Sequence, residues 1–206
     1  MTRSVVCLHG LRRTPADWDG VQAGLGAYGT VRTPDLPPRP ADALRTAGAA
    51  VAADDIVVGH SMGAVIALRL ADALPLRALV LTGCFFPPAR NGRSVAATIG
   101  DYAAHRVAFV RAIGGEAAEG RSAGSARALG LLIRRAVGRR ADTDITIPVL
   151  VVHARDDHHV PIDFALAAVA SHSGWVARVL DTGGHDLHVR RPEAWLDAVK
   201  PWLDGN

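Results

Sequence analysis

Short apolar runs and longer amphipathic segments alternate along most of the chain. The short runs are rich in Val and Leu and nearly continuous, which is typical of strands that a parallel sheet buries on both faces. They predict strands at Ser4–Leu8, Thr30–Pro34, Asp55–Val58, Arg77–Thr82, Pro148–His153 and Val176–Asp181. The amphipathic segments predict helices at Ala16–Leu25, Ala41–Ala53, Met62–Leu74, Pro161–Ser171 and Pro192–Lys200. The pattern therefore favours an α/β fold in which helices cover both faces of a parallel sheet.

Two prolines frame the last predicted helix. Pro192 suits its first turn, where the missing amide hydrogen costs nothing. Pro201 lacks the amide that a helix interior needs, so we expect it to end or kink the helix.

Residues 87–144 break the alternation, because no convincing strand occurs there. Two amphipathic helices are predicted near Ala96–Ile113 and Ala126–Arg140, with a loop rich in Gly, Ser and Ala between them. So long an insertion between two strands of one sheet is most simply a helical cap over the strand ends. The alternative is a second small domain with a role of its own.

The composition is that of a globular domain. The chain has 206 residues, 49% hydrophobic and 21% charged, which fits one domain spanning residues 1–206. Its longest apolar runs fall short of the roughly 18 residues of a membrane span. The apolar stretch Ser4–Leu8 is also too short for a secretory signal. We therefore expect a cytoplasmic protein with no membrane span.

Positive charge gathers in the insertion. The net charge is +3, but the segment between Phe85 and Ile145 holds ten arginines against five acidic residues. Such a segment can attract an acidic partner. Nucleic acid is not the expected one, because no aromatic residues are interleaved with these arginines. The expected partner is a small-molecule substrate, and the sequence leaves the oligomeric state open.

Gly59-His60-Ser61-Met62-Gly63 matches G-x-S-x-G, the pattern of a nucleophile on a sharp strand-to-helix turn. The glycines remove side chains that would collide at such a turn, and the serine hydroxyl stays exposed above the sheet. A second match, Gly120–Gly124 around Ser122, has no strand before it. Ser61 follows a predicted strand and precedes a predicted helix, so we expect Ser61 to be the nucleophile.

A serine nucleophile needs a base, and the base needs an orienting acid, in the chain order Ser, Asp or Glu, His. The fifth predicted strand runs into Asp156 and Asp157, and the sixth runs into Gly183-Gly184-His185. These groups therefore follow the carboxyl ends of parallel strands, where α/β sheets place their sites. Asp157 can alternatively cap the helix that follows, and a loop histidine is often only solvated.

Acyl transfer also needs two donors for the developing oxyanion. The Met62 amide, at the start of the helix after Ser61, is one candidate. The Leu11 amide in the loop after the first strand is the other, since Gly10 allows a close backbone approach.

These landmarks together resemble the α/β-hydrolase superfamily. The matching segments are Val5–Gly10, Gly59–Gly63, Ala154–Pro161 and Gly183–His185, in the family's order and across nearly the whole chain. The resemblance implies an α/β-hydrolase fold with a doubly wound, mainly parallel six-stranded sheet in the order 2-1-3-4-5-6, and an inserted helical cap at 87–144.

The resemblance also assigns the site. It implies Ser61 as nucleophile, His185 as base and Asp157 as orienting acid, with Leu11 and Met62 as oxyanion donors. Asp157 is favoured over Asp156 because the family's acid usually stands four residues before a proline. The first two strands of the family are absent, Ala154 replaces a commoner glycine, and residues 35–40 replace a glycine-rich loop.

Other residue groups are weaker signals. Phe85 and Phe86 leave the fourth strand toward the insertion, where they either pack a hinge or form an apolar wall that binds substrate. His185 with His188, or the run Asp156–His159, can be interpreted as metal ligands, but no helix places them on one face. We expect no metal and no cofactor. Cys7 and Cys84 lack zinc spacing, and a disulfide between them is not expected.

The expected function is a cofactor-free serine hydrolase of the carboxylesterase or thioesterase type. The basic insertion adds a weaker expectation that the substrate carries negative charge. Two alternatives remain. The resemblance also admits a carbon–carbon hydrolase, a lyase or a cofactor-free peroxidase, and any fold can serve a binding protein without catalysis.

Overall fold

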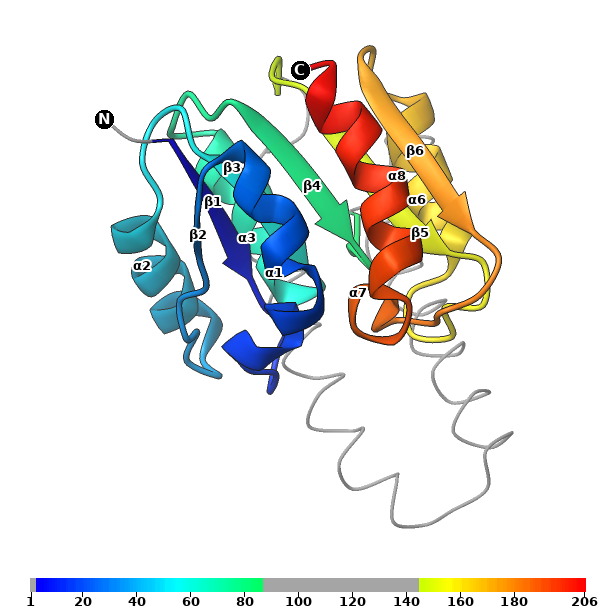
Figure 1. The fold of residues 1–206 in the computed structure, drawn as a ribbon, viewed down its shortest axis with the longest axis horizontal. Helices are drawn as coiled ribbons and strands as arrows, with labels where there is room; N and C mark the ends of the chain where they lie inside the picture. Colours follow the sequence, from blue (N-terminus) through cyan, green and yellow to red (C-terminus); the bar gives the residue numbers. More distant parts are fainter. Residues whose placement is uncertain (1–2, 87–144) are drawn as a thin grey trace, which may run out of the picture.

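In a computed structural model of the chain, residues 3–86 and 145–206 are described. They form one six-stranded sheet in which every neighbouring pair is parallel, in the order β2-β1-β3-β4-β5-β6. The expected strand order is therefore confirmed. The arrows of β1, β4 and β6 in Figure 1 point the same way. The strands are β1 (Ser4–Leu8), β2 (Thr30–Arg32), β3 (Ile56–His60), β4 (Ala78–Thr82), β5 (Val149–Ala154) and β6 (Trp175–Leu180).

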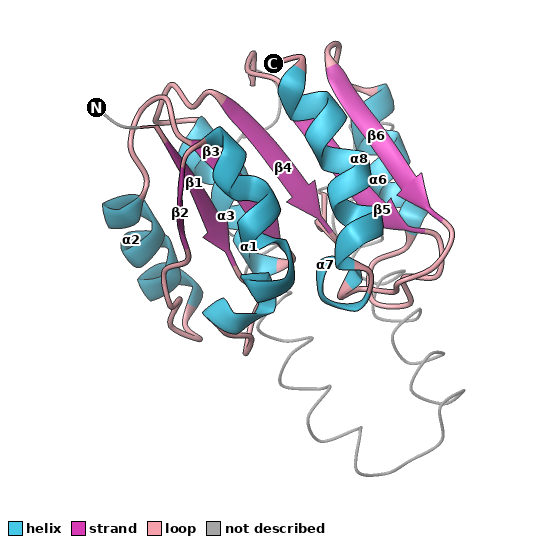
Figure 2. Ribbon diagram, in the orientation of Figure 1, coloured by secondary structure: helices cyan, strands magenta, loops and turns pink. Residues whose placement is uncertain are grey.

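Helices follow the strands as the alternation predicts, and Figure 2 shows them on both sides of the sheet. The helix expected from residue 16 begins instead with a 3-10 turn, Pro15–Trp18, and a short helix after His185 was not predicted. The helices are α1 (Asp19–Leu25), α2 (Pro40–Ala50), α3 (Met62–Ala71), α6 (Ile162–Ala170), α7 (Leu187–Arg190) and α8 (Pro192–Asp204).

The sheet separates two apolar cores. One lies against α2, α3 and α6, and the other lies against α1 and α8. Alternate residues of β1 supply them, since Val6 and Leu8 enter the first core while Val5 and Cys7 enter the second. This double burial explains why the strand segments read as continuous apolar runs rather than as alternating ones.

One prediction about a helix is wrong. Pro201 does not end α8, which continues to Asp204 with Pro201 inside it. Trp202 and Leu203 in the following turn are buried in the core on that face of the sheet. Their burial offsets the backbone hydrogen bond that the proline cannot make.

The expected cap at 87–144, with its two helices, its arginines and Ser122, lies outside the described residues. Within them, no helix is long and apolar enough to cross a membrane. Cys7 and Cys84 are both free and fully buried. Burial raises the pKa of both thiols well above the ordinary value for cysteine.

The carboxyl ends of the central strands lie at one edge of the sheet. The register pairs Leu8 with Gly59 and His60 with Thr82, so β1, β3 and β4 end close together. The segments that carry the predicted site leave this edge, which is where a parallel sheet exposes its loops.

Candidate active site

Ser61 lies on the abrupt turn between β3 and α3. Its backbone angles are φ 52° and ψ −113°, in a region that residues other than glycine rarely adopt. The Ser61 amide donates a hydrogen bond to the Thr82 carbonyl (3.0 Å), and its own carbonyl accepts from the amides of Ala64 and Val65 (3.1 and 3.2 Å). These bonds hold a strained residue in place, as is common at functional sites.

Both glycines of the Ser61 motif are required by close backbone contacts. A Cβ atom on Gly59 would lie 2.5 Å from the Ala64 Cα, and one on Gly63 would lie 2.0 Å from the Leu8 carbonyl oxygen. Neither neighbour is a flexible side chain that can move aside. The steric reason expected for the motif therefore applies to this chain.

His185 and Asp157 form a hydrogen-bonded pair. The distance between His185 Nδ1 and Asp157 Oδ2 is 2.9 Å, and the Asp157 side chain is 1% exposed. The other oxygen, Oδ1, accepts from the amides of His159 (2.8 Å) and Val160 (2.9 Å). Burial acts to raise the pKa of Asp157, but the His185 hydrogen bond and charge, together with the Val160 amide, outweigh it and lower that pKa.

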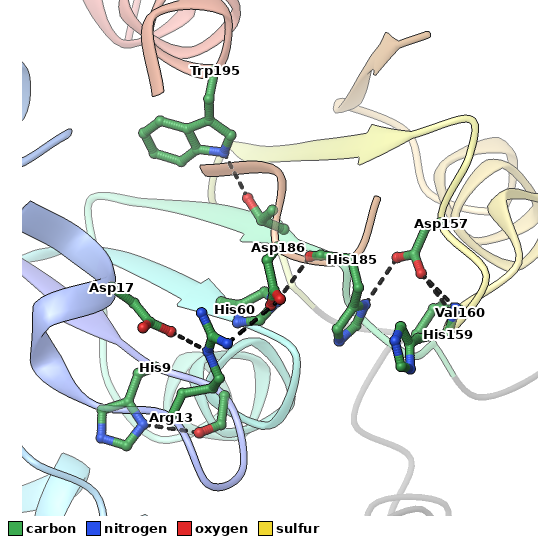
Figure 3. A network of polar contacts seen from close by, with 12 residues as sticks. His9, Arg13, Asp17, His60, Asp157, His159, Val160, His185, Asp186 and Trp195 are labelled. Carbon is green, nitrogen blue, oxygen red and sulfur yellow. Dashed lines mark hydrogen bonds and ion pairs between the residues drawn. The ribbon is translucent and has the colours of Figure 1, made fainter. Parts of the chain in front are cut away.

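The ionised Asp157 fixes the tautomer of His185. A carboxylate only accepts hydrogen bonds, so Nδ1 of His185 must carry the proton. The Nε2 atom of a neutral ring then keeps its lone pair and can accept a proton from a hydroxyl group. Figure 3 shows His185 with Asp157 on one side and His60 on the other.

Asp156 has a separate role that the sequence did not reveal. Its Oδ1 accepts from the Gly184 amide (2.8 Å) and its Oδ2 from the Gly183 amide (3.3 Å). Both glycines have positive φ angles, 138° and 64°, so the loop before His185 takes a path suited to glycine. Asp156 thus anchors the backbone of that loop, while Asp157 binds the ring of His185.

The Ser61 turn and the His185 loop meet at the carboxyl end of β4. Thr82, the last residue of β4, binds the Ser61 amide. The next residue, Gly83, has φ 54°, and a Cβ atom there would lie 3.1 Å from Nδ1 and Cε1 of His185. The predicted nucleophile and base therefore flank the same strand end. Gly83 was not singled out in the sequence, although a glycine directly after a strand at this edge is a usable signal.

The loop after β1 is held by His9, which is buried. Its Nδ1 lies 2.8 Å from the Gly10 carbonyl, and the Leu36 amide donates to its Nε2 at 2.8 Å. A single tautomer with the proton on Nδ1 makes both bonds. Among residues 3–86 and 145–206, neither the Leu11 nor the Met62 amide has a protein hydrogen-bond acceptor. Both predicted oxyanion donors thus have an amide to offer a ligand.

Phe85 and Phe86 follow β4 and are both buried. The Phe85 ring lies 5.6 Å from that of Phe164, and the Phe86 ring lies 5.8 Å from that of Trp175. Phe86 belongs to the core beside α6. A role of either ring in substrate binding stays a prediction.

In the described part of the chain, one group of side chains could hold a metal ion, and it differs from the two groups named from the sequence. Asp17, His60 and His188 place one potential ligand atom each within 4.8 Å of one another. Arg13, however, already forms an ion pair with Asp17 and contributes to lowering the pKa of both histidines, after burial. A guanidinium at this position opposes a bound cation, so we assign no metal to the cluster.

Comparisons with known proteins agree with this fold. The model of the alpha/beta hydrolase family matches residues 5–198, and no curated protein matches the sequence. Among solved structures, the chain is similar to the esterase RhEst1 from Rhodococcus sp. ECU1013, with a TM-score of 0.64 and 23% identity over 98% of this chain and 90% of that one. It is also similar to a bromoperoxidase from Bacillus anthracis, with a TM-score of 0.69 and 16% identity over 99% of this chain and 92% of that one.

A third similar structure is a monoacylglycerol lipase from Paleococcus ferrophilus, with a TM-score of 0.67 and 16% identity over 98% of this chain and 94% of that one. At such identities these structures establish the fold. The family model covers most of the chain. The chain belongs to the alpha/beta hydrolase family.

Proposed function

We propose that the protein is a serine hydrolase that cleaves an ester or thioester of a small molecule. The observation that carries this proposal is the buried, ionised Asp157 bound to Nδ1 of His185, at the same strand end as the strained Ser61. A hydroxyl beside such a pair has both a base and a group that stabilises the charged base.

Each group has one role in the proposed mechanism. Nε2 of His185 takes the Ser61 proton as the serine oxygen attacks the carbonyl carbon, and Asp157 stabilises the imidazolium that forms. The amides of Leu11 and Met62 donate to the oxyanion. The imidazolium then protonates the leaving alcohol or thiol. Water attacks the acyl-enzyme by the same steps, which releases the acid and restores Ser61.

The proposal predicts that Ser61→Ala removes covalent labelling by a fluorophosphonate and hydrolysis of p-nitrophenyl butyrate. The reason is that the acyl-enzyme cannot form without the Ser61 oxygen. Intact-mass spectrometry detects the adduct, and absorbance at the p-nitrophenolate band measures turnover. Ser122→Ala is the matched control, because Ser122 occupies the second G-x-S-x-G match. Labelling that persists in Ser61→Ala would overturn the assignment.

The arginine-rich insertion supports a substrate with negative charge, because it carries ten arginines against five acidic residues. We expect an ester with a terminal carboxylate to be hydrolysed with a higher kcat/KM than a neutral ester of equal length. The advantage should shrink as salt is raised from about 0.01 to 0.5 M, since salt screens exposed charges. A ratio that is flat across this range contradicts an acidic substrate.

A further inference from the structure

His60 occupies the position directly before Ser61, at the end of β3. Its side chain is fully buried, and its Nε2 atom lies 3.0 Å from the backbone carbonyl oxygen of His185. A carbonyl oxygen only accepts, so Nε2 of His60 must carry the proton and donate it. This hydrogen bond joins residues 125 positions apart and connects the Ser61 turn to the backbone of the loop that carries His185.

The other side of the His60 ring contacts the loop after β1. A Cβ atom on Gly10 would lie 2.9 Å from Nδ1 and 3.2 Å from Cε1 of His60, so the Gly10 backbone packs directly against the ring. Gly10 immediately precedes Leu11, the predicted oxyanion donor. One side chain therefore touches the β1 loop and the His185 loop, and it is covalently joined to the Ser61 turn.

The surroundings of His60 keep the ring neutral. The rings of His188 and His185 lie 4.6 and 4.9 Å away, and Asp186 Oδ1 lies 3.8 Å from Nε2. Arg13, from the loop after β1, faces it between Asp186 and Asp17 (Figure 3). Burial lowers the pKa of His60 well below its ordinary value, and the neighbouring histidines and Arg13 lower it further.

We infer that His60 is a positioning residue, which uses its Nε2–H bond to the His185 carbonyl to align the base with the Ser61 turn and with the loop after β1. The inference rests on the proposed hydrolase function. Ring orientation in a catalytic pair depends on the backbone that bears it, and a displacement of about 1 Å can cost about 100-fold in rate. A hydrogen bond at the His185 backbone limits that displacement.

Two variants at position 60 separate the hydrogen bond from packing. His60→Phe keeps a ring of similar size but donates nothing, so the His185 carbonyl loses its partner. His60→Gln keeps a donor near the position of Nε2. The matched control is His188→Phe, because His188 is equally buried and adjacent, and neither of its ring nitrogens has a hydrogen-bond partner among the described residues.

We expect His60→Phe to lower kcat for p-nitrophenyl butyrate about 10- to 100-fold, with KM changed less than about threefold. His60→Gln should restore kcat to within about threefold of the wild type, and His188→Phe should stay within about twofold. The rate of fluorophosphonate labelling should follow the same order. The inference is overturned if His60→Phe keeps its kcat, if His60→Gln is as impaired as His60→Phe, or if His188→Phe loses as much.

A measurement without substrate keeps the two proposals distinguishable. Nitrogen chemical shifts of the histidine rings report the tautomer, and we expect His60 to be protonated on Nε2 from pH 6 to 8. Amide hydrogen exchange near His185 should be faster in His60→Phe than in His188→Phe. A His60 proton on Nδ1, or equal exchange in both variants, overturns the inference. If the wild type hydrolyses no ester or thioester and takes no fluorophosphonate, the hydrolase function fails instead.

Discussion

At the scale of single residues, the neighbouring acids Asp156 and Asp157 bind different partners. Asp157 binds the His185 ring, whereas Asp156 accepts from the Gly183 and Gly184 amides. Residue spacing alone left these acids equivalent, since both follow β5. The resemblance to a family favoured Asp157, and the hydrogen bonds explain why one carboxylate orients a ring while the other orients the loop.

The first prediction concerns these two acids. Asp157→Asn should lower kcat by about 10⁴-fold, because an amide in this position favours the wrong His185 tautomer. Asp156→Asn keeps an acceptor oxygen for the Gly184 amide, so a loss below about tenfold is expected. Steady-state kinetics with p-nitrophenyl butyrate measure both. Equal losses in the two variants would mean that the orienting acid has been misassigned.

The second prediction concerns Gly83. Gly83→Ala should reduce kcat about 10- to 100-fold, because the new methyl group would lie 3.1 Å from the His185 ring on a backbone with φ 54°. The free energy of unfolding should fall by about 1 kcal/mol from the unfavourable φ. Gly26→Ala is the control, since Gly26 has an ordinary φ and open space around it. An active Gly83→Ala enzyme would show that the His185 ring tolerates a shift.

At the scale of elements, periodicity located the strands and helices to within a few residues. The β1 segment was predicted with its observed bounds, Ser4–Leu8, because the strand is buried on both faces. The expected edge strand at Thr30–Pro34 is shorter and ends at Arg32. The main error is α8, where a local rule about Pro201 is overridden by the burial of Trp202 and Leu203. Such packing depends on elements distant in sequence, which a local pattern does not contain.

The third prediction tests the cost of that proline. Pro201→Ala should raise the free energy of unfolding by about 1–2 kcal/mol, because alanine restores a backbone hydrogen bond inside α8 and Pro201 is exposed. Urea unfolding followed by circular dichroism measures the change. Catalytic activity should not change, since the substitution lies away from the predicted site. A less stable variant would show that α8 depends on the rigidity of the proline.

At the scale of the whole molecule, the sequence was sufficient for the sheet and the chain order of the predicted triad. The sequence was not sufficient to predict the long-range hydrogen bonds that hold the loops at the end of the sheet in place. The bonds from His60 to the His185 carbonyl and from Trp195 to the Thr82 hydroxyl (2.8 Å) join residues 125 and 113 positions apart. No motif specifies such pairs, because they arise only after the strand order brings separate loops together.

The fourth prediction follows from the buried histidines His60, His153 and His188. Burial lowers the pKa of all three, for His188 to about 3. Below about pH 6.5 the unfolded chain binds more protons at these positions than the folded protein does, so acid favours unfolding. Each histidine then removes up to about 1.4 kcal/mol per pH unit. Asp157 does not add to this loss above about pH 4, because the stabilisation from its lowered pKa is lost only at lower pH.

Urea unfolding at pH 7.5, 6.5, 5.5 and 5.0 measures this loss. We expect stability to be nearly constant from pH 7.5 to 6.5 and to fall by several kcal/mol at pH 5.0, by the same linkage. His188→Phe should reduce the slope by up to about 1.4 kcal/mol per pH unit, because it removes a group whose folded-state pKa is about 3. A wild-type stability that is flat down to pH 5.0 would mean that these rings accept protons without unfolding.

The chain has two cysteines, and both Cys7 and Cys84 are buried with raised pKa values. Thiol-directed dyes react with exposed thiolates, so the native fold should take up almost no label. A cysteine introduced at Val189, which is 41% exposed on α7, would then be a unique attachment point for a fluorophore. A dye there would report in real time on movements of the His185 loop while a substrate or inhibitor binds.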